Sequence, residues 1–215
     1  MSTVTDPPPL TVDILGWPPD GPTLRLHHDR FSYAGKFVMS NTGKAVARVA
    51  EDADVAPENG EVDANAAEAR PYDTDVVGAL AFNEDRTDSS TLWLRYVTVD
   101  RRYRGHGIGP RLVVVVREAA LERGYDRLRI AVNNPYAYDA LWKAGFGFTG
   151  EETGIAELVL EHPIDADERV YRRGLEGFLE RELTEGERSF IRRRLSTGPP
   201  RSFVGDGSDA RSDSR

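Results

Sequence analysis

A glycine-rich loop, RRYRGHGIGPR (residues 101–111), carries the residue types best suited to bind a ligand in this sequence. Its glycines stand at alternate positions, Gly105, Gly107 and Gly109. Glycine allows a positive φ and lets a ligand approach the main chain, and the unpaired amides at the start of a helix attract anions. Arginines at 102, 104 and 111 add positive charge. The loop therefore predicts a phosphate site between a strand and a helix.

The spacing of the loop excludes two common phosphate-binding motifs. A Walker loop needs a Gly-Lys-Ser/Thr ending, and this loop has no lysine. A dinucleotide fingerprint needs G-x-G-x-x-G, but counting from Gly105 the last position is Pro110. The pattern R-x-x-G-x-G does fit, with Arg104, Gly107 and Gly109. A tight turn with solvated arginines is the alternative interpretation.

The segments around the loop predict the elements that position it. Residues 75–82 and 91–99 are rich in β-branched and aromatic residues and are joined by the polar turn NEDRTDSS, which is typical of an antiparallel pair. Pro110 and Gly124 mark the two ends of a helix. The strand at 127–132 should then run parallel to 91–99, because a helical crossover returns the chain in the same direction.

Further elements are expected on both sides of this unit. A helix over NPYAYDALWKAG (134–145) begins with Asn-Pro and ends at glycine, and residues 146–150 and 155–162 supply two closing strands. On the N-terminal side, residues 23–28 and 36–50 look like strands, the second a hairpin that turns at 41–44.

Composition along the chain predicts its organisation. Prolines dominate residues 1–22, an extended lead-in, and residues 51–75 hold many acids in a solvated loop that belongs to a domain of residues 23–162. Residues 163–195 read as a charged helical extension, with Thr184 and Glu187 spaced as a capping box. A disordered tail is expected over residues 196–215.

Bulk composition excludes several classes of function. The chain has 215 residues, a net charge of −8 and no cysteine, so a general nucleic-acid binder and thiolate chemistry are excluded. The four histidines lack the spacing of a helical zinc pair, and no metal is expected. A membrane span and a secretory signal are also not expected, so we predict a cytoplasmic protein.

The loop in this setting resembles the GNAT superfamily of acyl-CoA-dependent N-acyltransferases. The resemblance covers roughly residues 24–162 and rests on VTVDRRYRGHGIGPRL, on RIAVNNPYAYDALWKAGF and on the order of strands around them. It implies an α/β (α+β) fold with a mixed, mostly antiparallel sheet, a splayed central parallel pair, flanking helices and here a C-terminal helical extension.

The resemblance also implies the site for acetyl-CoA, the acyl donor. Main-chain groups of Val97 and Val99 would pair with the pantetheine amides, and the loop amides would hold the pyrophosphate. The residues expected to contact the cofactor are Val97, Val99, Arg104, Gly105, His106, Gly107, Ile108, Gly109 and Asn133. For His106, a solvated histidine is the alternative interpretation.

The catalytic residues depart from the family pattern. Many relatives carry a glutamate on the strand before the loop, and TLWLRYVTV has no carboxylate. Glu84, Asp85 and Asp88 in the preceding turn either act as a base through water or are ordinary turn acids, so the base is unknown. The usual tyrosine position is Leu141; Tyr138, one helical turn earlier on the same face, is the candidate acid, with packing as the alternative.

Two functions follow from these observations. The first is an N-acetyltransferase that moves an acetyl group from acetyl-CoA to a primary amine of a peptide, protein or small molecule. The second is a CoA-binding regulatory or interaction module without turnover. The acceptor stays open, and the amphipathic C-terminal helices either dock on the domain or form a homodimer.

Overall fold

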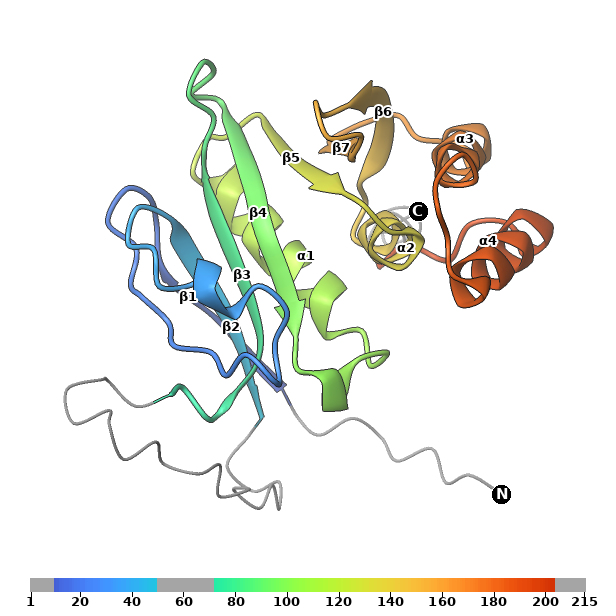
Figure 1. The fold of residues 1–215 in the computed structure, drawn as a ribbon. Helices are drawn as coiled ribbons and strands as arrows, with labels where there is room; N and C mark the ends of the chain where they lie inside the picture. The colour runs from blue at the N-terminus through green and yellow to red at the C-terminus, as the bar shows by residue number, and fades with distance from the viewer. Residues whose placement is uncertain (1–9, 50–71, 204–215) are drawn as a thin grey trace, which may run out of the picture. The chain divides into compact units, whose positions relative to one another are not determined.

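The computed structural model of the protein describes residues 10–49 and 72–203. Seven strands form a mixed, mostly antiparallel sheet in the order β1-β2-β3-β4-β5-β7-β6, with one parallel pair, β4 and β5, and with flanking helices (Figure 1). This confirms the expected fold class. The chain separates into two compact units, residues 1–83 with 95–112 and residues 84–94 with 113–215.

Unit 1 contains the N-terminal strands. They are β1 (Leu10–Gly16), β2 (Gly43–Val49) and most of β3 (Val76–Glu84). Both β1 with β2 and β2 with β3 pair antiparallel. The strand β2 is buried along most of its length because it has a partner on each side, and β3 is buried through Phe82.

Unit 1 also holds the segment between β1 and β2, which differs from the expectation. Residues 23–28 form no strand, although Leu24 and Leu26 are buried alternately as the pattern suggested. Their main chain bonds to other loops, Leu24 N–H to the Phe37 carbonyl and Asp73 N–H to the Arg25 carbonyl. The hairpin expected at residues 41–44 is absent as well, because β2 begins only at Gly43.

The strand β1 was missed within the expected lead-in. Prolines on both sides hid the alternation of LTVDILG, which as an edge strand has only one partner. Between β1 and β2 the chain forms a short 3-10 helix, η1 (Ala34–Lys36), which follows Phe31. Phe31, Ala34 and Phe37 join the core cluster of this unit with residues of β2 and β3.

The strand β4 (Thr91–Val99) and the helix α1 (Ile108–Glu122) each run through both units. The parallel register of β4 with β5 (Arg127–Val132) runs from Thr91 opposite Arg127 to Leu94 opposite Ile130. Within unit 1, the first turn of α1 packs on β3: a Cβ on Gly78 would lie 2.8 Å from Ile108 Cγ2. A glycine on β3 therefore lets the helix approach the strand closely.

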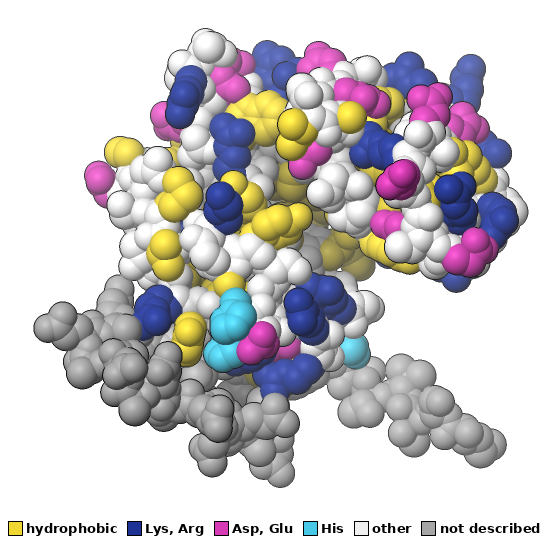
Figure 2. Space-filling model, viewed as in Figure 1, with side chains coloured by type: hydrophobic (Ala, Val, Ile, Leu, Met, Phe, Trp, Pro, Cys, Tyr) yellow, Lys and Arg dark blue, Asp and Glu magenta, His cyan; other side chains and the backbone are white. Residues whose placement is uncertain are grey.

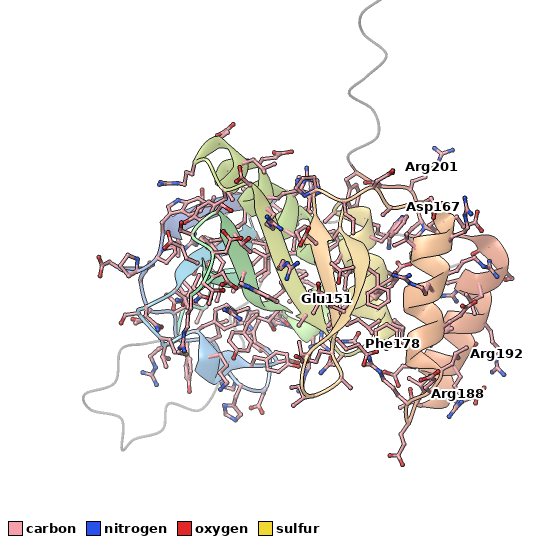
Figure 3. All side chains as sticks on the ribbon, turned by 90° about the horizontal axis from the view of Figure 1, so that it is seen from above. Glu151, Asp167, Phe178, Arg188, Arg192 and Arg201 are labelled. Carbon is pink, nitrogen blue, oxygen red and sulfur yellow. The ribbon has the colours of Figure 1, made fainter. Side chains whose placement is uncertain are left out.

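Unit 2 holds the remaining elements. They are β5, α2 (Pro135–Lys143), β6 (Gly147–Glu152), β7 (Leu158–His162), α3 (Glu168–Phe178) and α4 (Glu185–Thr197). The side chain of Asn134 caps α2, and Thr184 with Glu187 forms the expected capping box of α4. Figure 3 shows α3 and α4 side by side.

The ends of the expected segments fall partly outside the described residues. The acidic loop lies outside them from residue 51 to 71, and the tail from residue 204. In the part that is described, Phe203 N–H donates to the Lys143 carbonyl at the end of α2. The expected disorder from residue 196 therefore does not hold for residues 196–203. No helix of the described residues has the length and apolar character of a bilayer span.

Candidate functional site: the glycine-rich loop

The glycine-rich loop joins the end of β4 to the start of α1 within unit 1. After Val99 come Asp100, the 3-10 helix η2 (Arg101–Tyr103) and the loop itself, and α1 begins at Ile108. The helix therefore starts two residues before the expected Pro110, which falls in its first turn, where the missing N–H removes no helical bond. The amides of residues 108 and 109 thus belong to the unpaired group at a helix start.

Two glycines of the loop need to be glycine. Gly105 has φ 87° and Gly107 has φ 76°, in the left-handed region that strains other residues. Nothing lies within 4 Å of the position that a Cβ on Gly105 would take. The requirement at Gly105 therefore comes from the backbone angle, and the space beside it is open.

The end of β4 and the start of α1 lie side by side. A Cβ on Gly109 would lie 3.8 Å from Val99 Cγ2 and 3.9 Å from Val97 Cγ1. Both valines are half-buried, and Ile108 is buried. A strand whose main chain is expected to pair with an extended ligand thus lies directly beside the amides expected to bind its phosphates.

Asp100 organises the loop, although the sequence pattern did not single it out. Its fully buried carboxylate accepts hydrogen bonds from the main-chain N–H of Arg102 at 3.0 Å and from the Arg30 guanidinium at 2.7 Å. The Arg102 guanidinium also donates to it at 3.0 Å. Burial alone would raise the pKa of Asp100, but the hydrogen bonds from Arg102 and Arg30 outweigh it and hold the pKa below its usual range. An acid directly after a strand and before two arginines was the available signal.

The other loop residues make local contacts. Arg104 Nη2 donates to Ser32 Oγ at 3.0 Å and Arg104 Nε to the Val99 carbonyl at 3.4 Å. His106 is exposed, and its Nδ1 lies 3.2 Å from the Tyr103 carbonyl. This contact favours the tautomer with the proton on Nδ1, which leaves Nε2 as an acceptor. Such a ring is available to solvent as well as to a ligand.

Asn133 lies in unit 2, where it follows β5. Its side chain is exposed, and Asn134 Nδ2 donates to its Oδ1 at 3.1 Å. Its role toward the cofactor stays a prediction.

Two of the three turn acids, Asp85 and Asp88, do not have the properties of a general base, and the third, Glu84, accepts a hydrogen bond from the Tyr125 hydroxyl at 2.7 Å. Thr87 and Trp93 donate hydrogen bonds to Asp85, and together they hold its pKa below the usual range. Thr91 and Ser90 do the same for Asp88. A base with a lowered pKa is weak, and these residues precede β4, whereas the loop follows it.

Tyr138 lies in the interior of unit 2. Its side chain has no exposed surface, and its hydroxyl donates to the carbonyl oxygens of Val170 at 3.3 Å and Tyr171 at 3.2 Å on α3. Burial raises its pKa, and Arg173 offsets part of this effect. A Cβ on Gly174 would overlap the hydroxyl, so the helix is shaped to receive it. These contacts favour the packing interpretation of Tyr138 over that of an acid.

One cluster among the described residues has the composition of a metal site. Ligand atoms of His27, His28 and Asp29 lie within 4.8 Å of one another. The Asp29 N–H donates to His27 Nδ1 at 3.3 Å, which occupies one of the nitrogens. The cluster adds no support for a metal in the reaction.

Comparisons with known proteins identify the family of the chain. A family model described as the acetyltransferase (GNAT) family matches residues 29–148. A search of curated proteins finds no match. Solved structures of acetyltransferases also match the chain, at low identity and with TM-scores below 0.5.

Three of these structures illustrate the range. A Bacillus subtilis acetyltransferase in complex with CoA is 16% identical, with 71% of this chain and 97% of that chain covered and a TM-score of 0.47. A putative N-acetyltransferase from Lactobacillus plantarum is 19% identical, with 57% of this chain and 69% of that chain covered and a TM-score of 0.40. The PaiA N-acetyltransferase from Thermoplasma acidophilum in complex with coenzyme A is 15% identical, with 55% of this chain and 58% of that chain covered and a TM-score of 0.38. On the family match over more than half of its length, the chain belongs to the GNAT acetyltransferase family and is an acyl-CoA-dependent N-acyltransferase.

Proposed function

We propose that the protein transfers an acetyl group from acetyl-CoA to a primary amine. The observation that carries the proposal is the loop at the start of α1, in which Gly105 and Gly107 have positive φ and Gly109 lies beside Val97 and Val99. In this proposal the amides of residues 105–109 bind the pyrophosphate, and the main chain of Val97 and Val99 pairs with the pantetheine arm. Arg104 and His106, which belong to the same loop, would contact the phosphates in this proposal.

The reaction balances without a further reactant. The neutral amine nitrogen attacks the thioester carbonyl carbon and forms the C–N bond. The C–S bond then breaks, and CoA leaves as a thiolate. The nitrogen loses one proton and the thiolate takes one up, which gives an amide and the CoA thiol. Water can supply part of the protons that the thiolate takes up, because a free thiol has a pKa of about 8.5.

The first step sets the demand for a base. A lysine side chain with a pKa of about 10.4 is neutral about 0.04% of the time at pH 7, a handicap of roughly 4.6 kcal/mol. An α-amine with a pKa of about 7.8 is handicapped by only about 1 kcal/mol. Since β4 carries no carboxylate and the pKa values of Asp85 and Asp88 are lowered, an acceptor amine with a low pKa fits this site best.

Replacement of a loop glycine tests the proposal. Gly107→Ala adds a Cβ at φ 76°, and strain of about 1–3 kcal/mol should distort the amide cradle and lower CoA affinity about tenfold or more. Gly154→Ala is the matched control, because nothing lies within 4 Å of its Cβ position and no positive φ is required there. Calorimetric titration with CoA measures both variants.

A turnover assay separates the two functions. Release of free thiol from acetyl-CoA, dependent on an added amine, is expected for the acetyltransferase. CoA binding without amine-dependent thiol release over a broad amine panel would instead support the binding module. Equal CoA affinity of folded Gly107→Ala and wild type would remove the loop from the proposal.

A further inference from the structure

A pocket in unit 1 has no part in the binding of CoA proposed above. The pocket has a volume of about 490 Å³ and is formed by the segment between β1 and β2 together with Arg101 of η2. Phe31 and Ala34 are buried residues of its lining, whereas Tyr33 and Lys36 are exposed. It therefore combines an apolar floor with polar, solvent-facing walls.

Two of the side chains that line the pocket, Lys36 and Arg101, are cationic. His28 is a further basic residue of the lining, and no aspartate or glutamate belongs to it. Among the described residues, the side chains of Lys36 and Arg101 form no ion pair, while His28 Nε2 lies 3.4 Å from the exposed Asp29. Figure 2 shows histidine side chains on this face with an acidic side chain beside them and Lys and Arg side chains nearby. A basic pocket in a chain of net charge −8 favours an anionic ligand.

The pocket wall is bonded directly to the phosphate loop. The Arg101 N–H donates to the Arg30 carbonyl at 3.0 Å, and Arg104 Nη2 donates to Ser32 Oγ at 3.0 Å. Arg30 in turn donates to the buried Asp100. The position of the pocket relative to residues 100–104 is therefore set by hydrogen bonds, and a molecule in the pocket is a neighbour of the CoA loop.

Tyr33 adds independent evidence for a ligand. It has φ 61°, which a bulky residue with a Cβ rarely adopts, and such strain is concentrated at functional sites. Tyr33 is 53% exposed, although its neighbours Phe31 and Ala34 are buried in the core of the unit. Its ring lies 5.8 Å from the ring of Tyr96, the residue before Val97 on β4. The aromatic wall of the pocket thus reaches the strand proposed to bind the pantetheine arm.

We propose that this pocket binds an anionic group of the acceptor, so that the substrate is an amine that also carries a carboxylate or a phosphate. Lys36 and Arg101 would hold that group by charge-assisted hydrogen bonds, and Tyr33 would cover the apolar part of the acceptor. Polycationic acceptors are disfavoured, because like charges would face each other in the pocket. The inference rests on the proposed acetyl transfer and names the class of its acceptor.

Isosteric acceptors provide the test. The dipeptides Ala-Glu and Ala-Gln, both used as C-terminal amides so that neither carries an α-carboxylate, have the same shape and the same α-amine and differ in one negative charge. With saturating acetyl-CoA, kcat/KM for Ala-Glu should exceed that for Ala-Gln by roughly tenfold, the usual scale of one hydrogen bond to a charged group. Phosphoethanolamine and ethanolamine form a second pair for the phosphate form of the ligand.

Variants assign the preference to the pocket. Lys36→Gln and Arg101→Gln should each bring the Ala-Glu to Ala-Gln ratio close to one, mainly through KM. The matched control is Arg188→Gln, an exposed arginine on α4 in the other unit (Figure 3). It should keep the wild-type ratio.

The outcomes test the anionic acceptor separately from acetyl transfer itself. Thiol release with neutral amines as fast as with their anionic partners would overturn the inference and leave acetyl transfer standing. Retention of the preference in both pocket variants would overturn it as well. If no amine of either pair is turned over, calorimetry of Ala-Glu and Ala-Gln on the CoA-saturated protein decides: Ala-Glu binding that is lost in Lys36→Gln supports the pocket, and equal or absent binding overturns it.

The cofactor is the other source of a phosphate. Affinities for CoA and 3′-dephospho-CoA should change by the same factor in Lys36→Gln and Arg101→Gln if the pocket serves the acceptor. A loss confined to CoA would show that the pocket holds the 3′-phosphate, and this result would overturn the assignment to the acceptor.

Discussion

Two buried aspartates, Asp100 in unit 1 and Asp139 in unit 2, each collect several donors on one carboxylate. Asp100 accepts from Arg30 and Arg102, next to the proposed CoA loop. Asp139 accepts from the Tyr171 hydroxyl at 2.7 Å and lies 2.7 Å from Arg194 Nε and 2.9 Å from Lys143 Nζ. The first carboxylate orders a loop, and the second joins α2 to α3 and α4.

The surroundings of the two carboxylates differ in their access to solvent. The Arg102 side chain is 43% exposed, so the network of Asp100 opens toward the face where a ligand would bind. Tyr171, a partner of Asp139, is fully buried, and its ring packs against Tyr138 and Trp142. The same chemistry therefore serves site geometry in unit 1 and helix attachment in unit 2, and substitutions should separate these two roles.

The largest effect on stability is expected for Asp139→Asn. Removal of the charge leaves Arg194 and Lys143 without their buried anion, which should lower the free energy of unfolding by about 3 kcal/mol. CoA affinity of the folded variant should not change. Denaturant unfolding and CoA calorimetry measure the two quantities, with the exposed Asp165→Asn as control. An equal loss of CoA affinity would contradict the division of roles.

Asp100→Asn should show the reverse balance. We expect a loss of about 2 kcal/mol in unfolding free energy, since the exposed Arg102 regains water, and about tenfold weaker CoA binding, since the loop loses its anchor. The maximal rate with saturating acetyl-CoA should fall less than the affinity. Unchanged CoA affinity in the folded variant would show that Asp100 only stabilises the protein.

Low pH offers a milder way to weaken the same anchor. The pKa of Asp100 is lowered in the folded state, so its contribution to stability is present above the unfolded value of about 3.9 and is lost as the pH falls through the folded value. The difference in stability between wild type and Asp100→Asn should therefore be constant above about pH 5 and shrink below pH 4. Urea unfolding at several pH values measures this difference, and a constant difference down to pH 2 would contradict the prediction.

The parts that could be predicted from the sequence were those with local signals. The strand at 91–99, the strand at 127–132, the Asn134 cap and the capping box of α4 all depend on residues within a few positions of each other. The loop was predicted for the same reason, because its glycines and arginines are contiguous. The match to the GNAT family model over residues 29–148 confirms the family.

The parts that were missed depend on distant partners. Residues 23–28 alternate like a strand, but their main chain bonds to residues 37 and 73 instead of a neighbouring strand. Asp100 acquires its role from Arg30, 70 residues earlier, and Tyr138 acquires its surroundings from α3. The charged, helical sequence after residue 163 predicts α3 but cannot show that it covers Tyr138.

The smallest effect, and the sharpest test inside unit 2, is expected for Tyr138→Phe. The hydroxyl donates to two carbonyls of the helix α3, and a helix carbonyl has a main-chain donor of its own, so its loss should lower the unfolding free energy by only about 1 kcal/mol. Because the side chain is buried and its pKa is raised, turnover should stay at the wild-type level from pH 7 to 9. Tyr136→Phe, at an exposed position of the same helix, is the control.

The opposite result would be a turnover about 10²-fold lower with unchanged stability. A loss of this size is expected when a general acid is removed, and it would restore Tyr138 to that role. In that case unit 2 would supply chemistry as well as packing, and the contrast between Asp100 and Asp139 would no longer separate site from scaffold.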